Sequence, residues 1–197
     1  LARRLEEACG FLRLSSDRTR KRLAGLPPEA DAGAGYGEGI YTRAWTERTY
    51  EALLQHTKDS LFEGRRVVVD ASFLQEPQRR RFLEAGRAVG VPSLLFLCET
   101  SPDTVRRRLE AGREGASDAG WEVYREAAKR WEPPRDGTDR RIRRISNNGS
   151  PEAAFSQAEE ALKRFLDDAS NRPARIAVAE GIDRIGVTRE AFVEPLM

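Results

Sequence analysis

The sequence predicts an α/β fold: a three-layer sandwich with a mostly parallel sheet and helices on both faces. Short apolar runs, such as Val67–Val69 and residues 93–98, have the length and composition of buried strands. Longer amphipathic stretches alternate with these runs and have the period of a helix. The length of 197 residues is enough for one domain with a sizeable core.

The elements alternate along most of the chain. The expected strands cover residues 11–14, 67–69, 93–98 and 141–145, and the expected helices cover residues 1–8, 18–23, 40–62, 77–89, 104–115, 118–131 and 152–165. Residues 24–39 contain several glycines and prolines and predict a loop beside the site. This pattern predicts one domain over residues 1–166, followed by a linker and a C-terminal extension over residues 167–197.

Composition limits the classes of partner. The 34 basic and 32 acidic residues nearly cancel, so net charge provides no argument for nucleic-acid binding, and few aromatic residues interleave the basic runs. Nucleic acid is therefore an alternative partner that the sequence does not favour. The cysteines Cys9 and Cys98 match no metal-ligand spacing and fit a reduced, cytoplasmic protein. No segment approaches the ~20 apolar residues of a membrane span, so we expect no membrane partner.

A carboxylate directly follows the most apolar of the predicted strands. Asp70 ends the Val67–Val69 run, and Ser72 lies two residues further on. Ligands bind at the carboxyl ends of strands in open α/β sheets. One carboxylate and one hydroxyl at that edge suit a hydrated Mg²⁺ beside a phosphate chain. The alternative is a strand that ends in an ordinary turn aspartate.

Asp17 and a group of four arginines are further candidates for the site. Asp17 lies between the strand over residues 11–14 and a basic helix, where helix amides face a ligand. It is alternatively the N-cap of that helix. The four arginines form either a solvated helix face or a lid over phosphates; they are Arg106, Arg107, Arg108 and Arg113.

Five motifs in this order resemble a known family. They read LAR-x-L-x-x-A, L-x-S-D-x-x-R-K-R-L, YGEGIY…TYEALL, VVVDASFL…QRR and SDA…WEP. As an ordered set they resemble the P-loop kinases of the polynucleotide-kinase and zeta-toxin type. The nearest variety is the ATP-binding kinase domain that is often fused behind an aminoglycoside-phosphotransferase-like domain. The resemblance covers roughly residues 1–166.

The resemblance implies a P-loop NTPase-like fold and an enzyme that uses ATP and Mg²⁺. Such an enzyme moves the γ-phosphoryl group to a hydroxyl of a small molecule or of a nucleotide or nucleic-acid end. Asp17 matches the carboxylate that orients the acceptor hydroxyl and accepts its proton. Arg20 matches an arginine that holds an anionic group of the acceptor, and Asp70 matches the acid near the metal.

The same resemblance assigns Ser72, Arg108 and Arg113 to the nucleotide. Arg108 and Arg113 fall in the lid, where guanidinium groups stabilise charge on the transferring phosphoryl group. The family often has an arginine at the position of Gly112, so we expect Arg113 to substitute for it.

The largest departure from the family lies at the start of the chain. In the family, a strand and G-x-x-x-x-G-K-[ST] precede the LAR motif, and here Leu1 already belongs to a predicted helix. We therefore expect a chain without its first strand and phosphate-binding loop, with open sheet edges and weak ATP–Mg²⁺ binding when alone. A fused N-terminal domain fits the same expectation. The alternative function is a non-catalytic anion- or partner-binding domain derived from a P-loop kinase.

Overall fold

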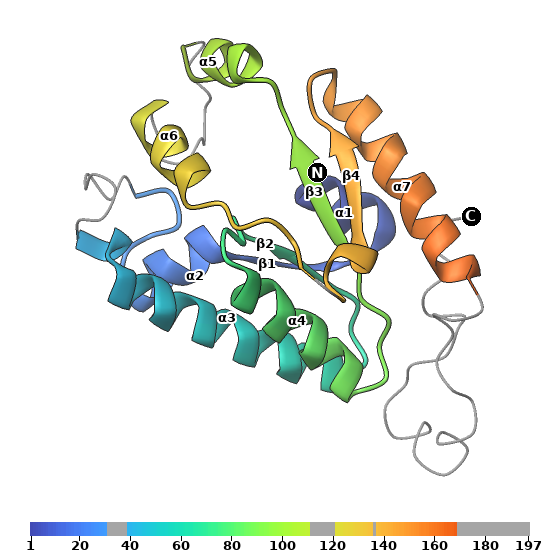
Figure 1. Ribbon diagram of the computed structural model, residues 1–197. Helices are drawn as coiled ribbons and strands as arrows, with labels where there is room; N and C mark the ends of the chain where they lie inside the picture. Colours follow the sequence, from blue (N-terminus) through green and yellow to red (C-terminus); the bar gives the residue numbers. More distant parts are fainter. Residues whose placement is uncertain (31–38, 111–120, 136, 169–197) are drawn as a thin grey trace.

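The computed structural model describes residues 1–30, 39–110, 121–135 and 137–168 (Figure 1). The strands are β1 (Leu12–Ser15), β2 (Val67–Asp70), β3 (Leu95–Glu99) and β4 (Ile142–Ser146). The α-helices are α1 (Ala2–Cys9), α2 (Ser16–Leu23), α3 (Arg43–Phe62), α4 (Glu76–Ala88), α5 (Pro102–Glu110), α6 (Trp121–Lys129) and α7 (Pro151–Asp167). Two short 3₁₀ helices, η1 (Gly39–Tyr41) and η2 (Asp139–Arg141), complete these elements.

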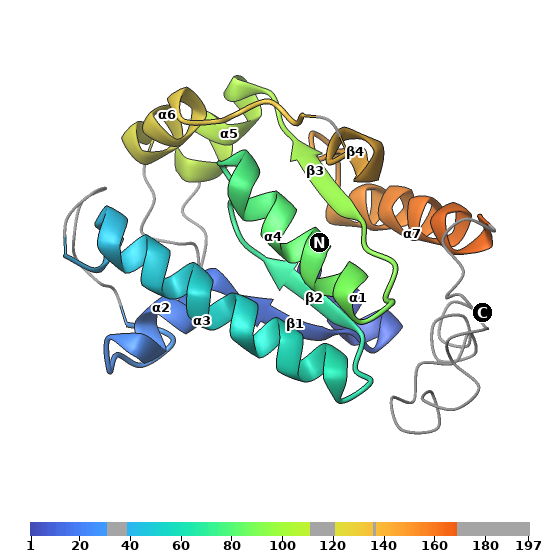
Figure 2. The ribbon, with the colours of Figure 1, turned by 60° about the horizontal axis from the view of Figure 1, so that its bottom comes forward.

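The helices cover both faces of parallel strands, which confirms the predicted three-layer α/β architecture. Helices α3 and α4 lie on one face, and α1 and α7 lie on the other (Figures 1 and 2). Strand β1 pairs with β2 and strand β3 with β4, both in parallel. Helical connections of this kind are what parallel neighbours require.

The strands form two separate pairs, whereas the sequence predicts one sheet. In the described part of the chain, β2 and β3 are not hydrogen-bonded to each other or to any strand between them. A cavity of about 580 Å³ lies between them and is lined by residues of both strands. Among the described residues, the edges of β2 and β3 that face this cavity pair with no other strand.

Two apolar clusters hold the layers together. On the face of α3 and α4, Leu61 and Val91 pack with Val67 and Val89. On the other face, the N-cap residue of α1 packs with residues from β3, β4 and α7; they are Leu1, Phe96, Ile145, Ala154 and Ala158. Burying a side chain of the size of leucine or isoleucine contributes about 1.5–3 kcal/mol. The second cluster therefore joins α1 to the β3–β4 pair across the cavity.

Capping residues set the helix starts more precisely than apolar spacing does. Thr42 Oγ1 accepts a hydrogen bond from the Trp45 amide and caps α3, so this helix begins at Arg43 rather than at Ile40. Ser150 caps α7 in the same way through the Ala153 amide.

No helix among residues 1–30, 39–110, 121–135 and 137–168 is both long enough and apolar enough to cross a membrane.

The open edges of β2 and β3 predict concentration-dependent self-association, because unpaired strand edges pair with other chains. Cys98 on β3 is exposed and lines the cavity. We expect Cys98→Lys to weaken association about tenfold, since charged side chains protect edges. Analytical ultracentrifugation under reducing conditions measures this. The matched control is Phe62→Lys, which charges an exposed apolar residue that is not among the cavity-lining residues. Equal effects of the two variants would show that association is not through these edges.

Candidate functional site at the carboxyl ends of the strands

The parallel pairing of β1 with β2 brings two of the predicted site residues to one edge. Ser15 is the register partner of Asp70, and Asp17 follows Ser15 by two residues in the first turn of α2. Both aspartates therefore come from the carboxyl ends of neighbouring strands, where α/β sheets bind ligands. The sequence predicts each aspartate at the end of a strand, and the structure adds that the two strands are neighbours.

Asp70 is an accessible carboxylate at the border of the cavity. Its side chain is 51% exposed, and Arg13 Nη1 lies 3.9 Å from its Oδ2 atom. The Arg13 side chain is largely buried, and its Nε atom lies 3.0 Å from Glu6 Oε2 on α1, an ion-pair distance without hydrogen-bond geometry. Sequence reasoning missed Arg13, although a basic residue inside a predicted strand is a signal that such a side chain has an acidic partner.

Asp70 and Ser72 fit a magnesium ion that is shared with phosphate groups. No cluster of three or more metal-ligand side chains occurs among the described residues. Magnesium usually takes one or two protein carboxylates and completes its shell with water and substrate phosphates. One half-exposed carboxylate with a nearby exposed hydroxyl is enough for that mode of binding.

The loop after β2 is held in a strained conformation. Phe73 has a φ of 43°, in the left-handed region that residues with side chains rarely adopt. The Phe73 amide donates to the hydroxyl of buried Tyr50 (2.9 Å), and that hydroxyl lies 3.3 Å from Ser72 Oγ. The rings of Tyr50, Phe73 and Phe82 pack edge to face. Tyr50 therefore fixes both the loop backbone and the hydroxyl beside Asp70.

Asp17 is not the N-cap of α2, so that alternative interpretation is wrong. The cap is Ser15, whose Oγ accepts from the Arg18 amide, because the backbone of Ser15 is extended there and α2 begins one residue later. The Asp17 carboxylate is partly exposed and lies 3.1 Å from Nζ of Lys21, one helical turn on. Lys21 Nζ also donates to the carbonyl of Pro28. Lys21 therefore restricts the orientation of the Asp17 carboxylate.

Arg20 is buried and fixes the start of α3. Its Nη1 donates to the Ile40 carbonyl (2.8 Å) and lies within hydrogen-bond distance of Thr46 Oγ1 (3.4 Å). Its guanidinium carbon lies 5.1 Å from the centre of the Tyr41 ring. Burial lowers the pKa of Arg20 from its ordinary value. These contacts join α2 to η1 and to the start of α3. That Arg20 also binds an anionic group of the acceptor stays a prediction.

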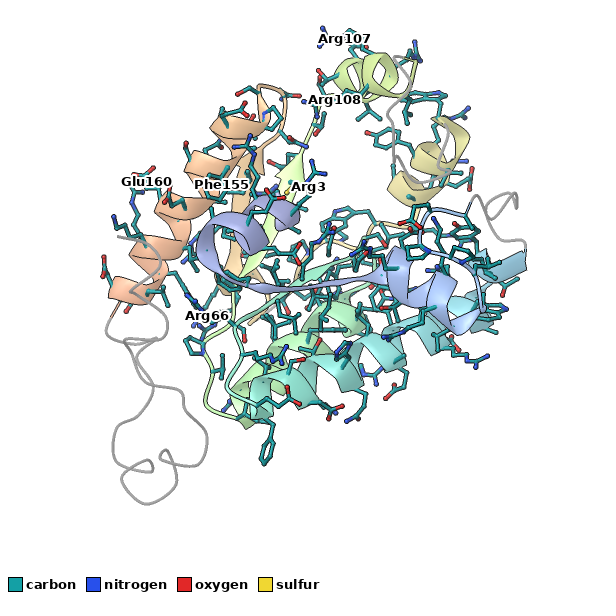
Figure 3. All side chains as sticks on the ribbon, turned by 180° about the vertical axis from the view of Figure 1, so that it is seen from behind. Arg3, Arg66, Arg107, Arg108, Phe155 and Glu160 are labelled. Atoms are coloured by element: carbon teal, nitrogen blue, oxygen red, sulfur yellow. The ribbon has the colours of Figure 1, made fainter. Side chains whose placement is uncertain are left out.

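The predicted lid arginines have different environments. Arg108 Nη2 donates to the carbonyl of Gly149 in the loop between β4 and α7 (3.1 Å). Figure 3 shows Arg107 and Arg108 on different sides of α5. Arg106 lies over the Trp121 ring of α6 (4.6 Å), so it joins α5 to α6. Arg113 lies outside the described residues.

Comparisons with known proteins agree with this architecture. A family model described as an AAA domain matches residues 1–134, more than half of the chain. Among solved structures, a gluconokinase from Sinorhizobium meliloti 1021 matches with a TM-score of 0.52 at 17% sequence identity. The match covers 85% of this chain and 88% of that chain. At this identity the likeness shows the fold, which is that of a P-loop kinase. No curated protein matches the chain.

We expect Tyr50→Phe to destabilise the fold by about 1–3 kcal/mol, because the strained Phe73 backbone loses the acceptor of its amide. Urea unfolding measures the change. Tyr124→Phe on α6, where the ring stacks on Trp121, is the matched control and should change stability by less than about 0.5 kcal/mol. Equal stability of wild type and Tyr50→Phe would contradict the role of this hydroxyl.

Proposed function

The chain belongs to the AAA domain family, and from this membership we propose that it is the kinase domain of an ATP- and Mg²⁺-dependent phosphotransferase. The acceptor is a hydroxyl of a small molecule or of a nucleotide or nucleic-acid end. The observation that carries the proposal is the pair of accessible carboxylates, Asp17 and Asp70, at the carboxyl ends of two paired parallel strands. The ordered motifs favour the polynucleotide-kinase and zeta-toxin type within this class.

Asp17 suits the acceptor side of the reaction. Its carboxylate projects from the first turn of α2 and is restricted by Lys21 at 3.1 Å. A carboxylate held in this way orients an acceptor hydroxyl and accepts its proton as the new bond forms. Helix α2 begins at the same edge, so its amino-terminal amides favour anionic groups nearby.

Asp70 and Ser72 suit the nucleotide side. Asp70 would hold the metal, and the Ser72 hydroxyl, which Tyr50 fixes, would contact the metal's water shell or a phosphate oxygen. When bound, Mg²⁺ neutralises charge on the phosphate oxygens. Arg108, on α5, supplies a guanidinium group that can leave the Gly149 carbonyl for a phosphoryl oxygen. Arg113 is proposed for the same task.

Asp17→Asn in the full-length protein tests the proposal. We expect turnover to fall about 10²–10⁴-fold, because the amide does not accept the proton, while ATP affinity stays nearly unchanged. Phosphoryl transfer from labelled ATP is measured on a panel of sugars, nucleosides and nucleic-acid ends. Asp59→Asn, which changes an exposed carboxylate on α3, is the control. Near-wild-type turnover of Asp17→Asn would remove Asp17 from the reaction. A wild-type protein that binds ATP but transfers nothing would instead support the anion- or partner-binding alternative.

Arg108→Ala should slow transfer far more than it destabilises the fold. An arginine aimed at developing negative charge contributes several kcal/mol to the transition state, whereas exposed polar contacts contribute about 0–1 kcal/mol to stability. Transfer rates and unfolding midpoints of the same samples decide between the two roles. The control is Arg107→Ala, whose guanidinium instead contacts Thr104 on its own helix. Unchanged rates for Arg108→Ala would remove the lid assignment.

A further inference from the structure

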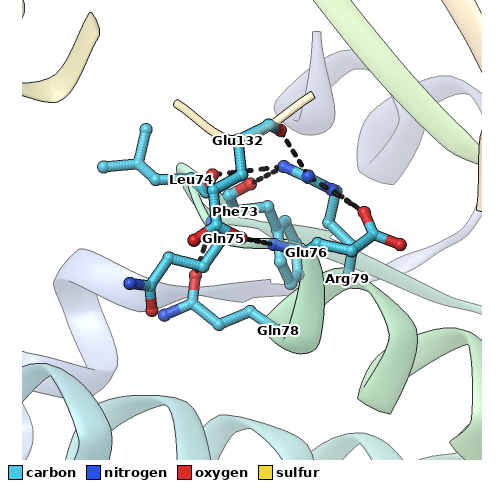
Figure 4. Close-up of polar contacts among 7 residues, drawn as sticks. All are labelled: Phe73, Leu74, Gln75, Glu76, Gln78, Arg79 and Glu132. Carbon is cyan, nitrogen blue, oxygen red and sulfur yellow. Dashed lines mark hydrogen bonds and ion pairs between the residues drawn. The ribbon is translucent and has the colours of Figure 1, made fainter. Parts of the chain in front are cut away.

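Arg79 is a buried cation whose partners come from different segments of the chain. It lies on α4 and is 2% exposed. Its Nη1 donates to the Phe73 carbonyl (2.7 Å) and the Leu74 carbonyl (3.3 Å), and its Nη2 donates to the Glu132 carbonyl (2.5 Å). Its Nε donates to Glu76 Oε2 at 3.0 Å (Figure 4). The guanidinium group is thus satisfied by four acceptors.

Glu132 forms a second set of bonds to the same loop. Its amide donates to the Leu74 carbonyl (2.9 Å), and its Oε2 accepts from the Glu76 amide (2.9 Å). A carboxylate at this position also interacts favourably with the positive end of α4. The adjacent Trp131 ring lies 4.5 Å from the Arg79 guanidinium carbon. Residues 131–132 are therefore held to the loop after β2 and to the start of α4 both by Arg79 and by Glu132 itself.

One of these segments carries part of the proposed site, and the other connects to the helices beside it. Phe73 and Leu74 directly follow Ser72, whereas residues 131–132 lie just beyond the end of α6 at Lys129. Arg79, Trp131, Asp70 and Ser72 all line the cavity between β2 and β3. Helix α6 is joined to α5, which carries Arg108, through the contact between Arg106 and Trp121. Arg79 thus connects the loop after β2, which carries Ser72, to the segment that follows α6.

We propose that Arg79 is a positioning residue that holds the loop 71–74 and the segment 131–132 in one fixed relation; its effect on catalysis rests on the proposed function. The planar fork of arginine reaches several carbonyl groups at once, which a lysine ammonium does not. The strained Phe73 backbone requires such support: the Tyr50 hydroxyl accepts from its amide and Arg79 donates to its carbonyl. A fully satisfied polar network in a buried site rigidifies its members.

Amide hydrogen exchange tests the proposal without any substrate. In Arg79→Met we expect exchange of the Glu76 and Glu132 amides to rise about tenfold or more, while exchange of the buried Ala158 amide in α7 stays unchanged. Arg79→Lys keeps the charge beside Glu76 but should show the same local increase. Arg80→Met is the matched control, because Arg80 is exposed and pairs with Glu84 on its own helix.

The outcomes separate positioning from general stability. Equal acceleration at Glu76, Glu132 and Ala158 would overturn the proposal, as would full protection in Arg79→Lys. If Arg79→Met does not fold, Arg79→Lys carries the same comparison. In the full-length protein, Arg79→Lys should lower kcat about tenfold or more and leave KM for MgATP within about twofold. If the proposed function is wrong, the wild-type protein will show no phosphoryl transfer. The amide exchange rates of the Arg79 variants would still test the positioning role.

Discussion

The parallel pairing of β1 with β2 is the constraint on which the candidate site depends. It aligns Ser15 with Asp70, so the two strands end together and their following segments leave the sheet at one edge. From there, α2 carries Asp17 and the loop after β2 carries Ser72. A shift of the register by one residue would turn the side chains of one strand to the opposite face of the pair. It would also move Asp17 and Asp70 apart along the edge.

Two buried arginines, Arg20 and Arg79, donate mainly to backbone carbonyls of segments near this edge. Arg20 fixes η1 and the start of α3, and Arg79 fixes the loop after β2. Taking a guanidinium group out of water costs several kcal/mol unless its donors are paired. These arginines therefore act as specific connectors between segments. Arg108 is more exposed than Arg20 and Arg79. It is therefore better able to leave its protein acceptor, the Gly149 carbonyl, for a phosphoryl oxygen.

The two strand pairs are joined by side chains rather than by a continuous ladder of hydrogen bonds. Leu1, the N-cap of α1, packs with Phe96 and Ile145 of the β3–β4 pair, and Arg4 of α1 pairs with Glu152 of α7. Apolar contact is less directional than a hydrogen-bonded ladder. The cavity between β2 and β3 thus lies between the two strand pairs, and Asp70, Ser72 and Arg79 are among the residues that line it.

The sequence by itself determined the features that depend only on residues close together in the chain. The Val67–Val69 strand, the alternation with helices and the placement of Asp17 and Asp70 at strand ends follow from apolar period and turn residues. Only the tertiary structure decided the split into two strand pairs, the pairing of Arg13 with Glu6 and the contacts of Arg79. Arg79 and Glu132 are 53 residues apart, and no local pattern predicts that their segments meet. That meeting is set by the packing of the layers, because side-chain partners across a fold are fixed by where whole elements lie.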